Sequence, residues 1–242
     1  MKSKTSLTLT ADAFVRQLTA LQTKPALEAV QKYFRDEGVE SKFIGVRMGS
    51  LFALAKEYMA MPLKEISKLL DSAYYEARMG AVCIMDFQAR EKKIATEKQK
   101  ELFDLYIKKH NKIDNWDMVD RAAPHVIGGY LNDRPRKILY KLAKSKNVYE
   151  RRTAIVSTWY FIRQGDIQDT FNIATLLVKD KHDLIHKAVG SWIREAGKRD
   201  KQQLLSFLDK HAKNMPAIML RYATEKLSTA EKKHYAGMRR QS

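Results

Sequence analysis

The residues from Asp114 to His125 combine an aromatic ring with several carboxylates and hold the chain's best candidates for chemistry. Trp116 and Asp120 are four residues apart, so a helix places them on one face. An aromatic plane beside a carboxylate suits a cationic ligand, because both stabilise positive charge. The alternative is structural. Trp116 then packs in the core, and the carboxylate pairs with Arg121 or Arg152. Spacing alone favours the structural alternative.

A second stretch carries two adjacent guanidinium groups. Arg151 and Arg152 face different sides of a predicted helix. One of them can pair with Glu150 or Asp120, while the other reaches a phosphate as a planar donor fork.

The segment around Gly190 has two features with more than one interpretation. Gly190 and Ser191 let another backbone or a sugar–phosphate strand approach closely, although helix packing explains the pair more simply. His182 and His186 are four residues apart, as in helical zinc sites, but Asp183 stands where the zinc-protease motif needs Glu. No clear third ligand is near. A metal hydrolase is therefore a minor alternative, and we expect no metal and no cofactor.

Apolar residues recur at helical spacing almost everywhere, and strict two-residue alternation is absent. The prolines each lie near the start of a helical pattern, where a missing N–H costs nothing. They are Pro25, Pro62, Pro124, Pro135 and Pro216. Ser228 and Glu231 have the spacing of a capping box before the last short helix. We expect a single all-α domain over residues 1–242, with loose tails at 1–9 and about 237–242.

A weak repeat is visible in five predicted helices, each with a basic residue followed by small or apolar ones. The basic residues are Arg78, Arg121, Arg152, Lys187 and Arg221. A spacing of roughly 30–47 residues is typical of one helical hairpin per unit, as in HEAT or TPR arrays. We therefore expect a right-handed superhelical solenoid of HEAT-like hairpins, with a concave basic groove into which these residues point.

The chain is strongly basic, with 45 Lys and Arg against 28 Asp and Glu and a formal net charge of +17. A surplus of this size attracts polyanions, and each phosphate contact releases counterions. Nucleic acid is therefore the partner class that the charge favours.

The remaining composition bears on location. The single cysteine, Cys83, lies in an apolar run and fits a buried thiol in a reducing compartment. No apolar run is long enough to span a membrane, and residues 1–10 lack the apolar stretch of a signal peptide. We expect a cytoplasmic monomer with no membrane association and no protein partner.

Several blocks in a fixed order resemble the DNA alkylation repair glycosylases of the AlkD type, which are built from HEAT-like repeats. The blocks are Phe43-Ile44-Gly45-Val46-Arg47, Trp116 to Asp120, Glu150-Arg151-Arg152, His182 to Glu195, and Met215-Pro216 with Leu220-Arg221-Tyr222-Ala223. The resemblance covers roughly residues 25–227, and it rests on the order of the blocks, since no single one is very specific.

The resemblance implies a DNA glycosylase that removes N3- and N7-alkylated purines, which are cationic, from double-stranded DNA. It implies that Asp120 is the catalytic carboxylate and that Trp116 and Arg152 help hold the lesion-bearing strand. The further DNA-binding candidates are Arg47, Tyr149, Lys187, Ser191, Trp192, Arg194 and Arg221. Because a cationic purine is already a good leaving group, one carboxylate that stabilises the sugar cation and orients water suffices.

The sequence departs from that family's pattern at three places. Ser191 stands where a second tryptophan is common, and Trp192 follows one residue later, about 100° around a helix. Tyr149 replaces a usual tryptophan, and Ala217-Ile218 replaces a frequent Arg-Thr pair. These changes leave an alternative open: a catalytically inactive relative that recognises damaged or unusual DNA. A protein-binding solenoid is a further alternative.

Overall fold

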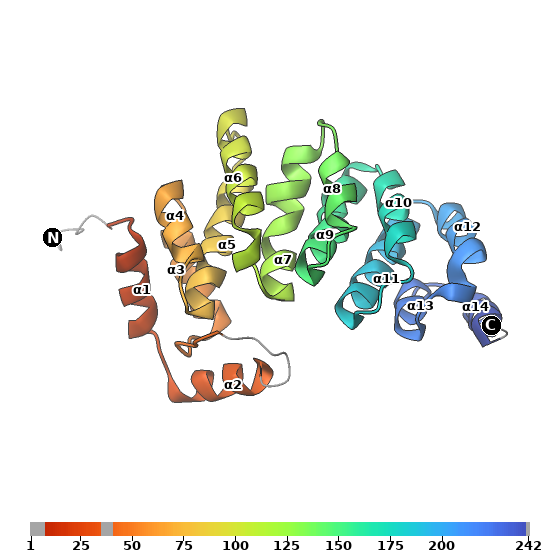
Figure 1. Ribbon diagram of the computed structural model, residues 1–242, viewed down its shortest axis with the longest axis horizontal. Coiled ribbons are helices and arrows are strands. Elements are labelled where there is room, and N and C mark those ends of the chain that lie inside the picture. Colours follow the sequence, from red (N-terminus) through yellow and green to blue (C-terminus); the bar gives the residue numbers. More distant parts are fainter. Residues whose placement is uncertain (1–7, 35–40, 241–242) are drawn as a thin grey trace. The chain divides into compact units, whose positions relative to one another are not determined.

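The computed structural model describes residues 8–34 and 41–240. Every regular element in these ranges is a helix, and the one extended contact there is an isolated β-bridge between Lys42 and Tyr74. The predicted all-α fold is therefore confirmed (Figure 1). The helices gather into two compact units, Met1–Asp114 and Asn115–Ser242. The expectation of a single domain stays a prediction.

The first unit is built around α5 (Tyr75–Ala89), which is buried along nearly its whole length. Packed against it are α1 (Ala11–Ala20), α3 (Met48–Glu57), α4 (Leu63–Leu70) and α6 (Thr96–Lys108). A short 3₁₀ turn, His110–Lys112, follows α6, and α2 (Lys24–Phe34) lies to one side in Figure 1. Cys83 is fully buried in α5, as predicted for a structural thiol.

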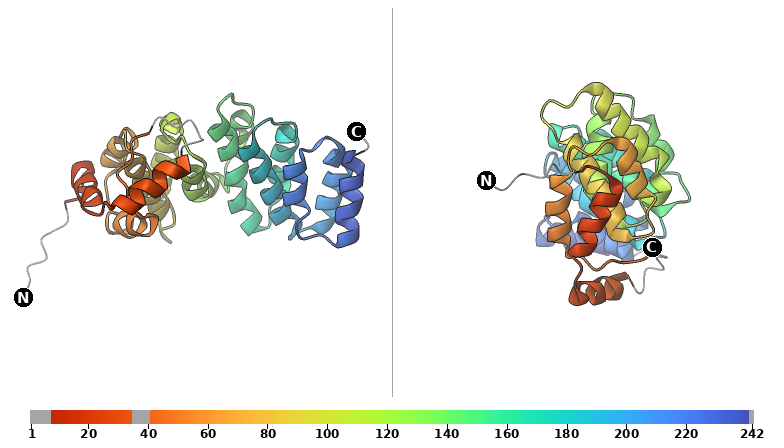
Figure 2. Two further views of the ribbon diagram at one scale, coloured as in Figure 1. Left: turned by 90° about the horizontal axis from the view of Figure 1, so that it is seen from below. Right: turned by 90° about the vertical axis from the view of Figure 1, so that its left-hand side faces the viewer.

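The second unit is a row of helices joined by short turns. They are α7 (Trp116–Ala122), α8 (Lys137–Leu142), α9 (Val148–Gln164), α10 (Gln168–Leu177), α11 (Asp183–Gly197), α12 (Lys201–His211), α13 (Ala217–Ala223) and α14 (Thr229–Arg240). The hairpin partners α8 and α9 pack together, as do α10 and α11, while α11 packs between α9 and α13. In Figure 2 the green-to-blue helices of this unit lie side by side in chain order. This arrangement is that of stacked helical hairpins.

Three of the five basic residues predicted to be equivalent do share one position. Arg152, Lys187 and Arg221 are each the fifth residue after the N-cap of their helix, in α9, α11 and α13. Arg78 is the fourth in α5, and Arg121 is the sixth in α7. Because one residue turns a side chain by about 100° around a helix, the predicted equivalence is wrong for these two.

In α7 the fifth residue after the N-cap is Asp120. The side chains at this position of α7, α9, α11 and α13 thus begin with a carboxylate and continue with three cations. Arg78, by contrast, is a buried structural residue of the first unit. Its guanidinium donates to Asp114 at 3.0 Å and to the carbonyl of Ser72 at 2.9 Å.

Side chains at the helix starts explain where several helices begin. Asn115 and Asn147 each accept a hydrogen bond from the backbone N–H two residues later, at the starts of α7 and α9. The predicted capping box is confirmed: the Glu231 carboxylate accepts the backbone N–H of Ser228 at 2.8 Å, and Ser228 Oγ accepts the N–H of Glu231 at 3.3 Å. From this start α14 runs to Arg240.

The predicted C-terminal tail is therefore partly wrong, because residues 237–240 are helical. The other parts of both predicted tails at 1–7 and 241–242 lie outside the described residues.

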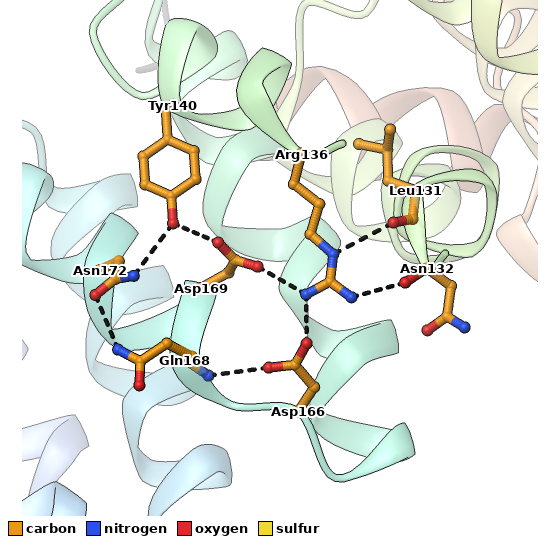
Figure 3. Close-up of polar contacts among 8 residues, drawn as sticks. All are labelled: Leu131, Asn132, Arg136, Tyr140, Asp166, Gln168, Asp169 and Asn172. Carbon is orange, nitrogen blue, oxygen red and sulfur yellow. Dashed lines mark hydrogen bonds and ion pairs between the residues drawn. The ribbon is translucent and has the colours of Figure 1, made fainter. Parts of the chain in front are cut away.

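A polar network ties the hairpin of α8 and α9 to the start of α10 (Figure 3). Arg136, directly before α8, donates to Asp166 at 2.5 Å and to Asp169 at 2.7 Å. Its guanidinium also lies 3.7 Å from the ring centroid of Phe161. Tyr140 donates to Asp169 as well. Charge-assisted contacts of this kind are stronger than neutral ones, so the network fixes consecutive hairpins relative to each other.

Gly128→Ala is expected to destabilise the second unit, because an added methyl would lie 2.3 Å from the carbonyl oxygen of Ser157 and 2.8 Å from Cβ of Tyr160. Overpacking of this kind costs about 1–3 kcal/mol of unfolding free energy. Gly129→Ala is the matched control, since its nearest contact would be the Tyr160 ring at 3.4 Å. Urea unfolding of both variants tests this, and equal effects would contradict the packing described.

Glu231→Gln is expected to make the free energy of unfolding depend less on pH in the acid range. Hydrogen bonds from Lys201 and Ser228 lower the pKa of Glu231 from its ordinary 4.5 to about 2. A pKa lowered by folding adds stability that is present above the unfolded value and is lost as pH falls toward the folded value. Thermal unfolding of wild type and variant from about pH 5 to about pH 2 measures this. Identical pH dependence of the two proteins would show that the carboxylate contributes nothing.

Candidate functional site

Asp120 and Arg152 form a two-point ion pair between α7 and α9. Nε of Arg152 donates to Oδ1 of Asp120 at 2.8 Å, and Nη2 donates to Oδ2 at 2.7 Å. This fork fixes the plane of the carboxylate. Arg152 is buried, whereas the Asp120 side chain keeps 28% of its surface exposed. The carboxylate is therefore held in one orientation and remains reachable from solvent.

The third guanidinium nitrogen of Arg152 also has an acceptor. Nη1 donates to the backbone carbonyl of Leu184, in the first turn of α11, at 2.6 Å. One side chain thus joins α7, α9 and α11. The neighbouring Arg151 faces another way and pairs with Asp180 at 2.6 Å. The two arginines therefore face different sides of α9, as predicted, and the predicted pairing with Asp120 is made by Arg152, while Arg151 binds Asp180.

Trp116 completes a cluster of three side chains with Asp120 and Arg152, called here the Asp120 cluster. It is the first residue of α7, directly after the capping residue Asn115. Its ring is half-buried, and the guanidinium carbon of Arg152 lies 5.7 Å from the ring centroid. At this distance an aromatic ring and a cation attract each other. The spacing of Trp116 and Asp120 predicted their common face.

The backbone changes pitch directly after the Asp120 cluster. α7 ends at Ala122 and continues without a break into a π-helical turn, Ala123–Gly129. In a regular α-helix residue 124 donates its N–H to the carbonyl of residue 120, but Pro124 has no N–H to donate. Short π-helical turns inside helices occur frequently at functional sites. Pro124 therefore marks the π-helical turn in the sequence, whereas its predicted meaning was only the start of a helix.

Two exposed cations occupy, in α11 and α13, the helix position that Asp120 and Arg152 occupy in α7 and α9. Lys187 in α11 and Arg221 in α13 hold the position that Arg152 holds in α9. Both side chains are exposed, and Lys187 has no ion-pair partner within the part of the chain that the structure describes. The Arg221 guanidinium lies 5.5 Å from the ring of Tyr222. Exposed cations at one repeat position are suited to phosphate contacts.

Arg194 is less available than sequence analysis expected. Its guanidinium pairs with Glu195 at 3.0 Å and also with Glu225. Burial raises the pKa of Glu195, but hydrogen bonds from Lys198 and Arg194 outweigh it and lower that pKa. A hydrogen bond from Lys226 and the charge of Arg194 also lower the pKa of Glu225. Arg194 thus lies between two ionised carboxylates.

The residues that depart from the glycosylase pattern lie in three helices: Tyr149 in α9, Ser191 and Trp192 in α11, and Ala217-Ile218 at the start of α13. Trp192 is half-buried, and its indole N–H donates to the backbone carbonyl of Val156 in α9 at 3.0 Å. Ser191 and Tyr149 are also half-buried. Helix packing explains Gly190, because an added methyl there would lie 2.5 Å from the carbonyl oxygen of Met219 in α13.

Arg47 belongs to the first unit, where it is the exposed N-cap residue of α3. The loop before it is held by the buried Glu76, whose carboxylate accepts the N–H of Ile44 at 2.9 Å and of Gly45 at 2.8 Å. Gly45 has φ of 92°, a conformation that favours glycine. The Phe43–Arg47 motif is thus a specifically folded loop.

The histidine pair that suggested a metal site has other partners. His182 caps α11 by accepting the N–H of Leu184 at 3.2 Å, and Nε2 of His186 lies 2.6 Å from the carbonyl oxygen of Asp180. Among the described residues, no three His, Cys, Asp or Glu side chains are grouped to hold a metal ion. Over residues 8–34 and 41–240, no helix combines the length and apolarity needed to cross a bilayer.

Comparison with known proteins supplies an independent observation. The family model described as DNA alkylation repair enzyme matches residues 14–227, a range that includes the whole Asp120 cluster. Among solved structures, a predicted DNA alkylation repair enzyme from Enterococcus faecalis is similar, with a TM-score of 0.64. At 14% identity over 86% of this chain and 97% of that chain, the likeness concerns the fold. No curated protein matches significantly. Because the family match spans most of the sequence, the chain belongs to the DNA alkylation repair enzyme family.

Proposed function

We propose that the protein is a monofunctional DNA glycosylase that excises N3- and N7-alkylated purines from duplex DNA, with Asp120 as the catalytic carboxylate. The observation that carries the proposal is the fixed but accessible carboxylate of Asp120, oriented at both oxygens by Arg152. Family membership supplies the substrate class, since alkylated DNA is the target that the family's description names.

The chemistry needs only a carboxylate and water. The N-glycosidic bond breaks with its electron pair moving onto the purine, which neutralises the ring's positive charge. C1′ of the sugar becomes oxocarbenium-like, and the negative charge of Asp120 stabilises it. Water then attacks C1′ and gives its proton to the carboxylate. A carboxylate oriented in advance pays no reorganisation cost during this step.

Arg152 acts in this proposal as a positioning residue. All three of its nitrogens have acceptors within the protein, and the residue is only 6% exposed. It is therefore poorly placed to contact a phosphate, which was one of its two expected roles. Lys187 and Arg221, exposed at the same position of the next helices, are better phosphate contacts. Trp116 offers its ring to the cationic lesion.

Asp120→Asn is expected to lower base release by about 100-fold or more, because the amide keeps the shape of the side chain but loses its charge. DNA binding should be retained. The measurement is chromatographic detection of free 7-methylguanine and 3-methyladenine from methylated duplex DNA, with a binding titration alongside. Unchanged turnover in the variant would remove Asp120 from the mechanism.

Lys187→Ala and Arg152→Gln are expected to have different effects, because Lys187 contacts a DNA phosphate in this proposal whereas Arg152 orients Asp120. Loss of one phosphate contact should reduce the slope of log K against log salt by about 0.9 in Lys187→Ala. Arg152→Gln should leave that slope unchanged and slow base release by about 100-fold, as misplacement by about 1 Å can do. Titrations at several salt concentrations give the slopes. A reduced slope in Arg152→Gln would reassign this residue to the phosphates.

One observation keeps the inactive DNA-binding relative as a second candidate. Trp192 is hydrogen-bonded to α9, and Ser191 offers no ring at the position where the resemblance implies one. If that ring is essential, wild type binds duplex DNA but releases no base above the Asp120→Asn control. Binding that does not weaken with salt would favour a protein-binding scaffold instead.

A further inference from the structure

The face of α9 that carries Arg152 continues into an aromatic ring and a second cation. Arg163 follows Arg152 by eleven residues, so their side chains differ by only about 20° around the helix. Trp159 lies between them in the sequence and is also within about 20° of Arg152 around the helix. Trp159 is half-buried and Arg163 is exposed. Neither residue has a role in the proposed function.

The charge of Arg163 is not neutralised by a carboxylate. Over residues 8–34 and 41–240, its side chain makes no ion pair and no hydrogen bond. Asp166, the nearest acidic residue in the sequence, is bound to Arg136 at 2.5 Å instead. The guanidinium carbon of Arg163 lies 5.1 Å from the ring centroid of Trp159. Because a ring attracts a cation without accepting its N–H groups in ordinary hydrogen bonds, the five donors of Arg163 remain for a ligand.

Trp159 is fixed by the π-helical turn that follows α7. The ring of His125, in this turn, packs edge-on against Trp159 with ring centroids 5.5 Å apart, and against Tyr160 at 6.0 Å. A methyl group added to Gly128 would lie 2.8 Å from Cβ of Tyr160, which shows how closely the turn approaches α9. The ring on which the Arg163 guanidinium lies therefore has a defined position.

The place of Arg163 along α9 determines which strand of a bound duplex it can reach. Helix α11 packs between α9 and α13, so the row formed by Arg152, Lys187 and Arg221 crosses the helix axes. A DNA strand whose phosphates contact Lys187 and Arg221 follows this row. Eleven residues displace Arg163 from the row by about 16 Å along the helix axis. The grooves of B-DNA, about 6 Å and about 12 Å wide, separate its two strands by distances of this order.

We propose that Arg163 binds a phosphate of the strand opposite the alkylated base and that Trp159 positions its guanidinium. The inference rests on the DNA contacts of the proposed function but not on its catalytic step, because neither residue belongs to the Asp120 cluster. Arginine forms charge-assisted hydrogen bonds to phosphate. Contacts to both strands fix the register and the orientation of the protein on the duplex.

Arg163→Gln and Gln164→Glu form a matched pair of variants. Each lowers the net charge equally, and the two exposed positions differ by about 100° around α9. We expect Arg163→Gln to reduce the slope of log K against log salt on duplex DNA by about 0.9, and Gln164→Glu to leave it nearly unchanged. Fluorescence anisotropy of a labelled duplex at several salt concentrations gives the slopes. Equal changes in the two variants would reduce the effect to net charge and contradict the contact.

Duplexes with one strand neutralised as methylphosphonates identify the strand that Arg163 contacts. Each duplex carries one N7-methylguanine on a 2′-fluorinated sugar, which marks the lesion strand and resists cleavage because fluorine disfavours a cationic sugar. We expect Arg163→Gln to weaken binding at least about fivefold when the lesion strand is neutral, and to have no effect when the opposite strand is neutral. Lys187→Ala should show the reverse pattern. The same pattern in both variants, or weakening that does not depend on the strand, would overturn the assignment.

Trp159→Leu and Trp159→Phe test the positioning role. Leucine removes the ring, so we expect Trp159→Leu to weaken duplex binding about two- to fivefold, and Trp159→Phe to retain most of the affinity. In the Arg163→Gln background, Trp159→Leu should weaken binding no further. Additive weakening in that double variant would show that Trp159 does not act through Arg163.

Base release, measured alongside binding, separates this inference from the proposed function. A wild type that binds duplex DNA but releases no alkylated base would contradict the glycosylase, and the salt slopes would still support the second-strand contact. A wild type that releases the base while Arg163→Gln keeps the full salt slope would overturn the contact and leave the glycosylase intact. Absence of any duplex binding would contradict both.

Discussion

The ion pair between Asp120 and Arg152 is the interaction on which the site depends. A buried ion pair contributes little net stability, because removing two charges from water costs nearly as much as their attraction returns. An apolar pair of similar volume would hold α7 and α9 together as well. What the ion pair provides is a negative charge of fixed orientation, 28% exposed, at the surface of a strongly basic protein. Breaking it from either side would leave an uncompensated charge that is at least partly buried.

The repeat explains how such a pair arises. The fifth residue after the N-cap faces the same side in α7, α9, α11 and α13, and the four residues are Asp120, Arg152, Lys187 and Arg221. Neighbouring helices bring the first two within hydrogen-bonding distance. The last two have no such carboxylate at this position of a neighbouring helix, so their charges are directed outward. One repeat position thus supplies an oriented carboxylate and two exposed cations.

Sequence patterns predicted the helical class, the hairpin spacing, the capping box at Ser228 and the common face of Trp116 and Asp120. They failed where one residue of register matters. Arg78 and Arg121 were aligned with Arg152, but each is rotated by about 100° from that position. Patterns also cannot show backbone acceptors. The carbonyl of Leu184, which fixes the third nitrogen of Arg152, has no signature in residue types. The choice of Arg152 over Arg121 as the partner of Asp120 depends on how α9 packs against α7, which spacing leaves open.

The most direct measurement of the central claim is a double-mutant cycle on single-turnover base release, using Asp120→Asn, Arg152→Gln and both changes together, with rates measured against spontaneous release in protein-free DNA. If Arg152 acts only by orienting Asp120, its replacement should slow the wild type strongly and leave the Asp120→Asn rate nearly unchanged. If Arg152→Gln lowers the rate by the same factor in both backgrounds, the two residues act independently, and the positioning account is contradicted.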